Sequence, residues 1–117
     1  MKLRTGLLCL ATALAPLPAA AHHGWAGQEN SKVTVVEGPI QAVRYRNPHG
    51  EIEVTQGNQR WQVTLAPIAR MQARGVTEDE LKVGQVVRIS GHRNLDMSKL
   101  EVKANDITIA GKTTDLR

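Results

Sequence analysis

The sequence predicts an all-β domain with one short helix, folded as a five-stranded Greek-key barrel of the OB type. Two observations support this prediction. Five segments of β-favourable residues follow one another and are separated by turn residues. The main helical pattern lies between the third and the fourth segment, where an OB barrel has its helix. A half-open antiparallel roll would give a similar periodicity and is the alternative fold.

Residues 1–21 have the three parts of a secretory signal peptide. A cationic start precedes an apolar stretch over residues 6–15, and small residues follow up to Ala21. The apolar stretch is about half of the roughly 20 residues in a membrane-spanning helix. We therefore expect a periplasmic protein that begins at His22 and has no membrane span. Cys9, the one cysteine, leaves with the signal peptide, so the mature chain offers no thiolate to a metal.

A polar arm precedes the first barrel strand. Residues 22–32 are polar and aperiodic, which predicts a flexible segment. β-Favourable residues begin at Val33 and continue to Tyr45, and their alternation changes phase near residues 38–39 and again at 42–43. Such phase changes are typical of a long, bent strand that contains bulges.

A hairpin is predicted after this strand. A turn over residues 47–50 leads to alternating apolar residues at Ile52 and Val54, and a second alternating run covers residues 61–65. Residues 56–58 lie between the two runs and include a glycine, so they are expected to form the hairpin turn.

Helical signals follow the hairpin. Pro67 suits the first position of a helix that continues to Arg74, and Gly75 suits a left-handed cap at its end. Thr77–Glu80 has the spacing of a capping box, which predicts a second helical turn.

Two further strands complete the predicted barrel. Residues 86–89 and 100–109 show β patterning, and the second segment changes phase at residues 105–106. Residues 111–117 are polar, which predicts a loose tail. The barrel domain is therefore expected to cover residues 33–110.

Composition excludes several functional classes. Without the signal peptide the net charge falls from +4 to +2, and the aromatic residues number three in all: Trp25, Tyr45 and Trp61. Because nucleic-acid interfaces use basic surfaces or stacking aromatic residues, we expect no nucleic-acid partner. The chain also lacks a G-x-S-x-G motif and a glycine-rich phosphate loop. We therefore expect a protein that is not an enzyme.

Two histidines at the mature N-terminus are predicted metal ligands. If the signal peptide is cut after Ala21, His22 supplies an α-amine and an imidazole, and His23 adds a further nitrogen. Nitrogen ligands without thiolates favour Cu(II) over most first-row metals, so Cu(II) is the predicted ion. A cut one residue earlier would keep Cu(II) binding in a changed geometry. The alternative is that both histidines are solvated and inert.

His49 is the third predicted ligand. It follows Asn47 and Pro48 at the end of the first strand, where proline restricts the backbone and favours a fixed imidazole. The alternative is an ordinary Asn-Pro-x-Gly turn in which His49 has no ligand. His92 lies on the outward positions of the fourth strand and is predicted to be a surface residue.

Three short motifs resemble a family of small exported bacterial proteins of unknown function. The motifs are His22–Trp25, Asn47–His49 and Leu81–Val87. Members of that family typically begin His-His-Ser-Phe and carry a Thr-Asn-Pro-His turn, whereas this chain has glycine and tryptophan at the Ser-Phe positions and Arg46 before the Asn-Pro-His triplet. The similarity runs to about Ile109. It implies an exported barrel with functional histidines at the same three positions, and it implies no particular activity.

The sequence thus favours a periplasmic, non-catalytic binding protein that holds a Cu(II)-type ion through His22, His23 and His49. One alternative is a metal-free module that binds a peptide, a glycan or an envelope protein on the barrel face near Tyr45 and Trp61. Another is a copper oxidase-like enzyme with an N-terminal histidine ligand, which is disfavoured because a small barrel has little shielded space for a substrate.

Overall fold

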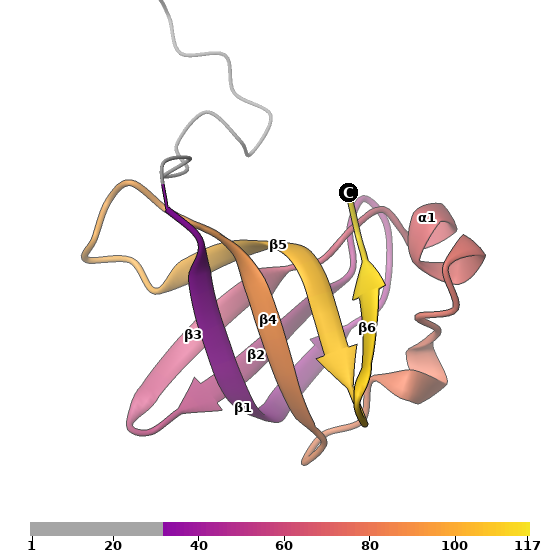
Figure 1. Cartoon of the computed structure of the whole chain (residues 1–117), viewed down its shortest axis with the longest axis horizontal. Helices are drawn as coiled ribbons and strands as arrows, with labels where there is room; N and C mark the ends of the chain where they lie inside the picture. The colour runs from indigo at the N-terminus through magenta and orange to yellow at the C-terminus, as the bar shows by residue number, and fades with distance from the viewer. Residues whose placement is uncertain (1–31) are drawn as a thin grey trace, which may run out of the picture.

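A computed structural model describes residues 32–117 of this protein. These residues form six strands, one α-helix and one 3-10 turn (Figure 1). In chain order the elements are β1 (Thr34–Arg44), β2 (Glu51–Gln56), β3 (Gln59–Thr64), α1 (Ile68–Ala73), η1 (Glu78–Glu80), β4 (Val86–Arg93), β5 (Glu101–Ile109) and β6 (Lys112–Asp115).

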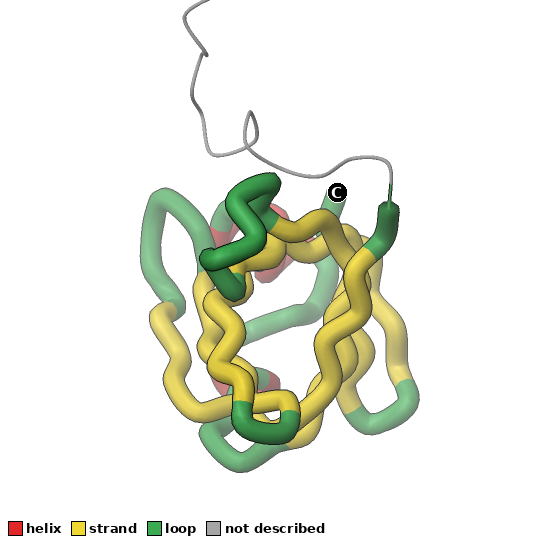
Figure 2. Tube along the Cα trace, turned by 90° about the vertical axis from the view of Figure 1, so that its left-hand side faces the viewer, coloured by secondary structure: helices red, strands yellow, loops and turns green. Residues whose placement is uncertain are grey.

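The first five strands form a closed barrel. Neighbouring strands follow the order β3-β2-β1-β4-β5-β6, and β3 also pairs with β5 in parallel, which closes the ring (Figure 2). The closing pair joins Gln62–Thr64 to Glu101–Lys103. The helix lies between β3 and β4, as expected for an OB barrel. The predicted fold class is therefore confirmed.

Local distortions bend the strands into this ring. The β1–β2 ladder shifts register between Ile40 and Ala42, next to the second predicted phase change. The β1–β4 ladder runs without a shift to Pro39, so the first predicted phase change is not a bulge in that ladder. The β4–β5 ladder shifts between Ser90 and Gly91 and leaves Asn105 as the extra residue, as the pattern of the fifth strand predicted.

Close backbone approach requires glycine at two points of the barrel. A Cβ atom at Gly38 would lie 1.9 Å from the carbonyl oxygen of Thr55 in β2. A Cβ atom at Gly91 would lie 2.1 Å from the carbonyl oxygen of Lys103 in β5. Both distances are far below van der Waals contact, so any side chain would force the strands apart.

The end of α1 follows the predicted cap, whereas the next turn does not. Gly75 has φ +82°, the amide of Val76 donates to the Met71 carbonyl at 2.9 Å, and that of Gly75 donates to Gln72 at 3.2 Å. These two bonds form a Schellman motif. A second helical turn follows as predicted, of the 3-10 type (η1), but the predicted capping box is wrong because Thr77 makes no side-chain cap.

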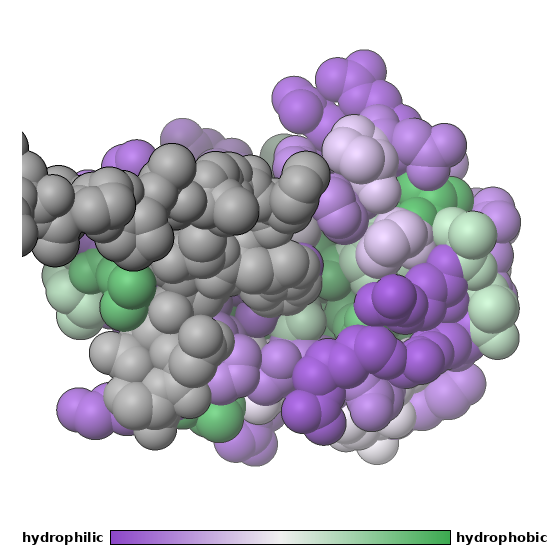
Figure 3. All heavy atoms as spheres, turned by 90° about the horizontal axis from the view of Figure 1, so that it is seen from above, coloured by the Kyte–Doolittle hydropathy of each residue, from purple (hydrophilic) through white to green (hydrophobic). Residues whose placement is uncertain are grey.

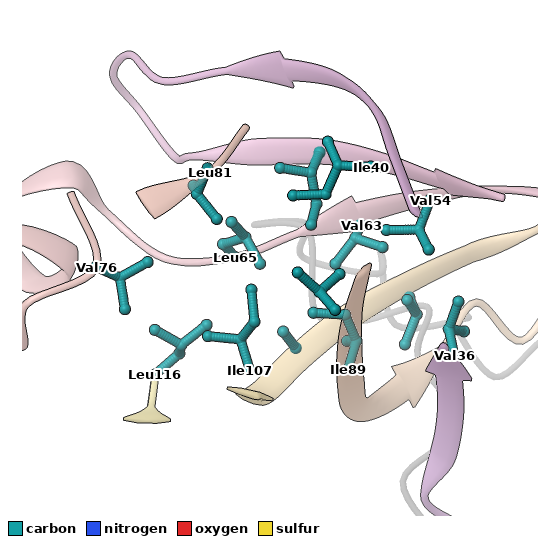
Figure 4. Packing of buried hydrophobic residues seen from close by; sticks show 14 of the residues in the cluster. Val36, Ile40, Val54, Val63, Leu65, Val76, Leu81, Ile89, Ile107 and Leu116 are labelled. Atoms are coloured by element: carbon teal, nitrogen blue, oxygen red, sulfur yellow. The ribbon is translucent and has the colours of Figure 1, made fainter. Parts of the chain in front are cut away.

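The prediction of a loose polar tail over residues 111–117 is also wrong. Residues 112–115 form β6, which pairs with β5, and the side chain of Leu116 is only 2% exposed. Figure 4 shows Leu116 beside Ile107 within the buried cluster. The pattern of polar residues hides this strand because its side chains face solvent while its backbone completes the edge of the sheet.

Candidate functional site

The structure describes one of the three predicted metal ligands. His22 and His23 lie outside the described residues. His49 is half-buried in the β1–β2 loop, after a cis peptide bond between Asn47 and Pro48. It lines a pocket of about 410 Å³ near the C-terminus of the described chain.

We call this cavity the β5 pocket, because three consecutive residues of β5 form one of its walls. Its lining residues come from the β1–β2 loop, the segment between β3 and α1, α1 itself, β5 and the C-terminal residues. They are His49, Leu65, Ala66, Pro67, Arg70, Lys103, Ala104, Asn105, Leu116 and Arg117.

The β5 pocket lies where β3 and β5 diverge. Their pairing ends at Thr64 and Lys103, beyond which the chain after β3 turns toward α1 while β5 continues beside β4. On one side, Gly50 fixes the segment after β3 through hydrogen bonds of 2.8 Å with Leu65 and Ala66. On the other, the amide of Leu116 donates to the Asn105 carbonyl at 2.8 Å.

Apolar side chains line the inner part of the β5 pocket. Leu65, Ala66, Ala104 and Leu116 are each no more than 2% exposed. Figure 3 shows the molecule from this end of the barrel. Where grey atoms do not cover it, hydrophobic surface (green) lies between hydrophilic side chains (purple). The cavity therefore combines an apolar interior with a polar rim, as small-molecule sites commonly do.

Positive charge gathers on the same pocket. Lys103 is 9% exposed and is the one charged side chain among the buried residues that the structure describes. Burial, with a smaller contribution from the positive charge of Arg70, lowers the pKa of Lys103 to about 8. The guanidinium of Arg70 donates to the Leu116 carbonyl at 3.2 Å, which holds it at the pocket. Arg117 adds a third cationic side chain.

His92 connects the beginning of β1 to the β5 pocket. Its Nδ1 atom lies 3.3 Å from the Lys32 carbonyl oxygen, and its Nε2 atom lies 3.1 Å from Nδ2 of Asn105. If the Asn105 amide donates to Nε2, then Nδ1 carries the proton and donates to Lys32. His92 is thus half-buried and hydrogen-bonded instead of being a plain surface residue.

The two aromatic residues of the barrel are engaged in the structure itself. Trp61 is only 4% exposed, and the guanidinium carbon of Arg93 lies 5.0 Å from its ring centroid. The hydroxyl of Tyr45 donates to the Val76 carbonyl at 2.8 Å. Burial and the nearby carboxylate of Glu78 raise the pKa of Tyr45. Trp61 is thus nearly buried and Tyr45 half-buried, and the partner-binding face predicted near them gains no support.

Within residues 32–117, no three or more side chains of histidine, cysteine, aspartate or glutamate come together as a metal site would require. No helix in the described part of the chain is long and apolar enough to cross a membrane.

Sequence reasoning singled out His49, whose role as a metal ligand stays a prediction, and it missed the other polar residues of the pocket. Lys103 stands in the alternating run Val102–Ile109, where a lysine normally marks a solvent-facing position. Arg70 and Arg117 lie on a short helix and in the presumed tail. The one local signal was the phase change at Asn105, which marked a bulge and thereby a special position in β5.

One family model matches the chain over residues 8–103, and its description is a family of unknown function. The match covers β1 to the first part of β5, including His49 and Lys103. No curated protein matches the chain.

Proposed function

The chain belongs to DUF6152, a family of unknown function, and we propose the following role, which is argued from the residues of this chain. It is a periplasmic, non-catalytic binding protein, and His49 acts with His22 and His23 to hold a Cu(II)-type ion at the rim of the β5 pocket. The observation that supports this proposal most directly is the position of His49, which is half-buried beside a cavity of about 410 Å³.

The second support is the place where β1 begins. Lys32 contacts His92, and His92 contacts Asn105, which lines the β5 pocket. The beginning of β1 and the C-terminus also lie at the same end of the barrel (Figures 1 and 2). The segment that carries His22 and His23 therefore joins the barrel close to the pocket that contains His49.

Chain length is compatible with a shared site. Eight residues lie between His23 and Lys32, and an extended chain spans about 30 Å over the nine steps from one to the other. A domain of the size of residues 32–117 has a radius of gyration of about 12 Å. The segment is thus long enough to bring both histidines to His49.

The ligand set suits Cu(II). Three imidazoles, joined by the α-amine of His22 if the mature chain begins there, are nitrogen donors of the kind that bind Cu(II) more tightly than most divalent first-row ions. The residue that would supply a thiolate, Cys9, lies in the predicted signal peptide. This chemistry favours the oxidised copper ion over Cu(I).

Titration of the exported, correctly processed protein with Cu(II) tests the proposal, with the affinity measured by competition against a chromophoric chelator. We expect the His22→Ala, His23→Ala double variant to bind Cu(II) at least about a hundredfold more weakly. We expect His49→Ala to bind it about tenfold more weakly, which corresponds to about 1.4 kcal/mol.

His92→Gln is the matched control, because it removes one histidine but keeps a side chain that can hydrogen-bond at this position. Its Cu(II) affinity should equal that of the wild type. Equal affinity of the double variant and the wild type would contradict the metal proposal. Sustained turnover of an oxidisable phenol by the copper-loaded protein would contradict the non-catalytic part.

A further inference from the structure

We propose that the β5 pocket binds an aliphatic carboxylate, with the carboxylate at Lys103 and Arg70 and the hydrocarbon chain on the apolar floor. This site does not depend on copper, because the residues that form it all lie within the described barrel. It adds an organic ligand to the metal role proposed above.

The charge of the lining selects an anion. Among the described residues, the pocket lining includes Arg70, Lys103 and Arg117 and no aspartate or glutamate. Arg117 is ion-paired with Asp115, whose Oδ1 atom lies 3.6 Å from Arg117 and 3.7 Å from Arg74, so we assign the carboxylate to Arg70 and Lys103. A cavity lined by cations in this way attracts a negatively charged group.

The burial of Lys103 strengthens this selection. A charged side chain that is 9% exposed loses hydration, which costs free energy. The positive charge of Arg70 lies close enough to lower the pKa of Lys103 further. A bound carboxylate would interact favourably with both cations and accept charge-assisted hydrogen bonds from them.

Hydrogen-bond donors remain for such a ligand. One terminal nitrogen of Arg70 donates to the Leu116 carbonyl, and a guanidinium has five N–H donors in all. The Asn105 side-chain nitrogen contacts His92 and has a second N–H. The two side chains are fixed by contacts within the barrel, so the geometry of the donors is set before a ligand arrives.

The apolar floor and the volume distinguish an aliphatic carboxylate from an inorganic anion. Leu65, Ala66, Ala104 and Leu116 would contact only hydrocarbon, which gains free energy when it leaves water. A cavity of about 410 Å³ also lies in the range of small-molecule sites. Phosphate or acetate would leave most of this floor without a contact.

Isothermal titration of the metal-free processed protein with octanoate, in the presence of a chelator, tests the site. We expect saturable binding of one octanoate per chain. 1-Octanol, acetate and inorganic phosphate should each bind at least about tenfold more weakly, since each lacks one of the two features that the pocket recognises. Equal affinity for octanol would overturn the anion requirement, and equal affinity for phosphate would overturn the requirement for a hydrocarbon chain.

Variants locate the site. Lys103→Met and Arg70→Gln should each weaken octanoate binding by at least about tenfold, whereas Arg88→Gln on the outer face of β4 should leave it unchanged. Arg70 is exposed, so we expect its replacement to cost little stability even though the hydrogen bond to the Leu116 carbonyl is lost. Lys103→Arg keeps the charge and should retain most of the affinity if Lys103→Met perturbs folding. An equal loss in Arg88→Gln would show that only the net charge matters and would overturn the proposed site.

Copper and octanoate give separate results. His22→Ala, His23→Ala removes two of the three proposed metal ligands but leaves every described lining residue of the β5 pocket, His49 included, in place. This double variant should therefore bind octanoate as the wild type does. Failure of the copper titration alone would leave the carboxylate site intact, and failure of the octanoate titration alone would leave the metal site intact.

Discussion

At the scale of single residues, the most informative feature is a lysine in a nearly buried position. Lys103 lies opposite His92 in the β4–β5 ladder and is 9% exposed. Its sequence neighbours Val102 and Ala104 are buried in the barrel core. Burial lowers the pKa of Lys103 to about 8, and lysines with lowered pKa values are common at ligand sites. The residue therefore links the stability of the barrel to the proposed carboxylate site.

The pH dependence of stability follows from the pKa of Lys103. Its value of about 8 lies below the ordinary 10.5, so the unfolded chain binds more protons than the folded one between these two pH values. The contribution of Lys103 to the free energy of unfolding therefore rises with pH above about 8 and is constant and unfavourable below it. Urea unfolding at pH 7 and pH 9.5 measures this effect, with Lys103→Met as the reference.

We expect Lys103→Met to be more stable than the wild type at pH 7 and its advantage to shrink by roughly 1–2 kcal/mol at pH 9.5. The comparison cancels the titration of Tyr45, whose raised pKa acts in the opposite direction and is present in both proteins. A constant difference between the two proteins across this pH range would contradict the assignment.

At the scale of elements, β6 turns the C-terminal residues into part of the domain. Its backbone pairs with β5 from Asp106 to Ile109, and Arg70 and Arg74 of the α1 region donate to the carbonyls of Leu116 and Asp115. The strand thus connects the sheet edge to the helical segment. Leu116 then supplies both a core contact and part of the pocket floor.

Replacing Leu116 with alanine should lower the free energy of unfolding by about 2–4 kcal/mol, because it leaves a cavity in the core. Leu95→Ala is the matched control, since Leu95 is 53% exposed in the β4–β5 loop and the same replacement there should cost less than about 0.5 kcal/mol. Chemical denaturation of both variants measures the difference. Equal losses would contradict the role assigned to β6.

At the scale of the whole molecule, the described residues contain a continuous hydrophobic core. The buried hydrophobic residues run from Val36 to Leu116 and form one cluster inside the closed barrel (Figure 4). The β3–β5 pairing closes the barrel as far as Lys103, and the β5 pocket begins where this pairing ends. The same topology therefore provides both the stability and the site.

A fragment of residues 32–117 should fold on its own. Because the core cluster lies within this range, we expect one cooperative thermal transition, with a midpoint within about 5 °C of that of the processed protein, a change worth about 1 kcal/mol for a domain of this size. The fragment should retain octanoate binding and lose high-affinity Cu(II) binding. A broad, non-cooperative transition would show that residues before Lys32 are required for the fold.

The sequence by itself determined the barrel class, the hairpin, the cap at Gly75 and the bulges near Ala42 and Asn105. Each of these depends on local periodicity or on the φ angle that glycine allows, and both are properties of neighbouring residues. The same local reasoning placed His49 in a turn after the first strand, because proline and turn residues are neighbours in the sequence. Its role as a metal ligand stays a prediction.

Only the tertiary structure decided the membership of β6 and the composition of the β5 pocket. The polar residues 112–115 show no hydrophobic pattern that would predict a strand, because β6 is stabilised by backbone pairing to β5. Arg70, Lys103 and Arg117 are far apart in the sequence and meet where β3 and β5 diverge. Which side chains become buried and which charges come close together depends on contacts between residues far apart in the sequence. No local pattern can therefore predict them.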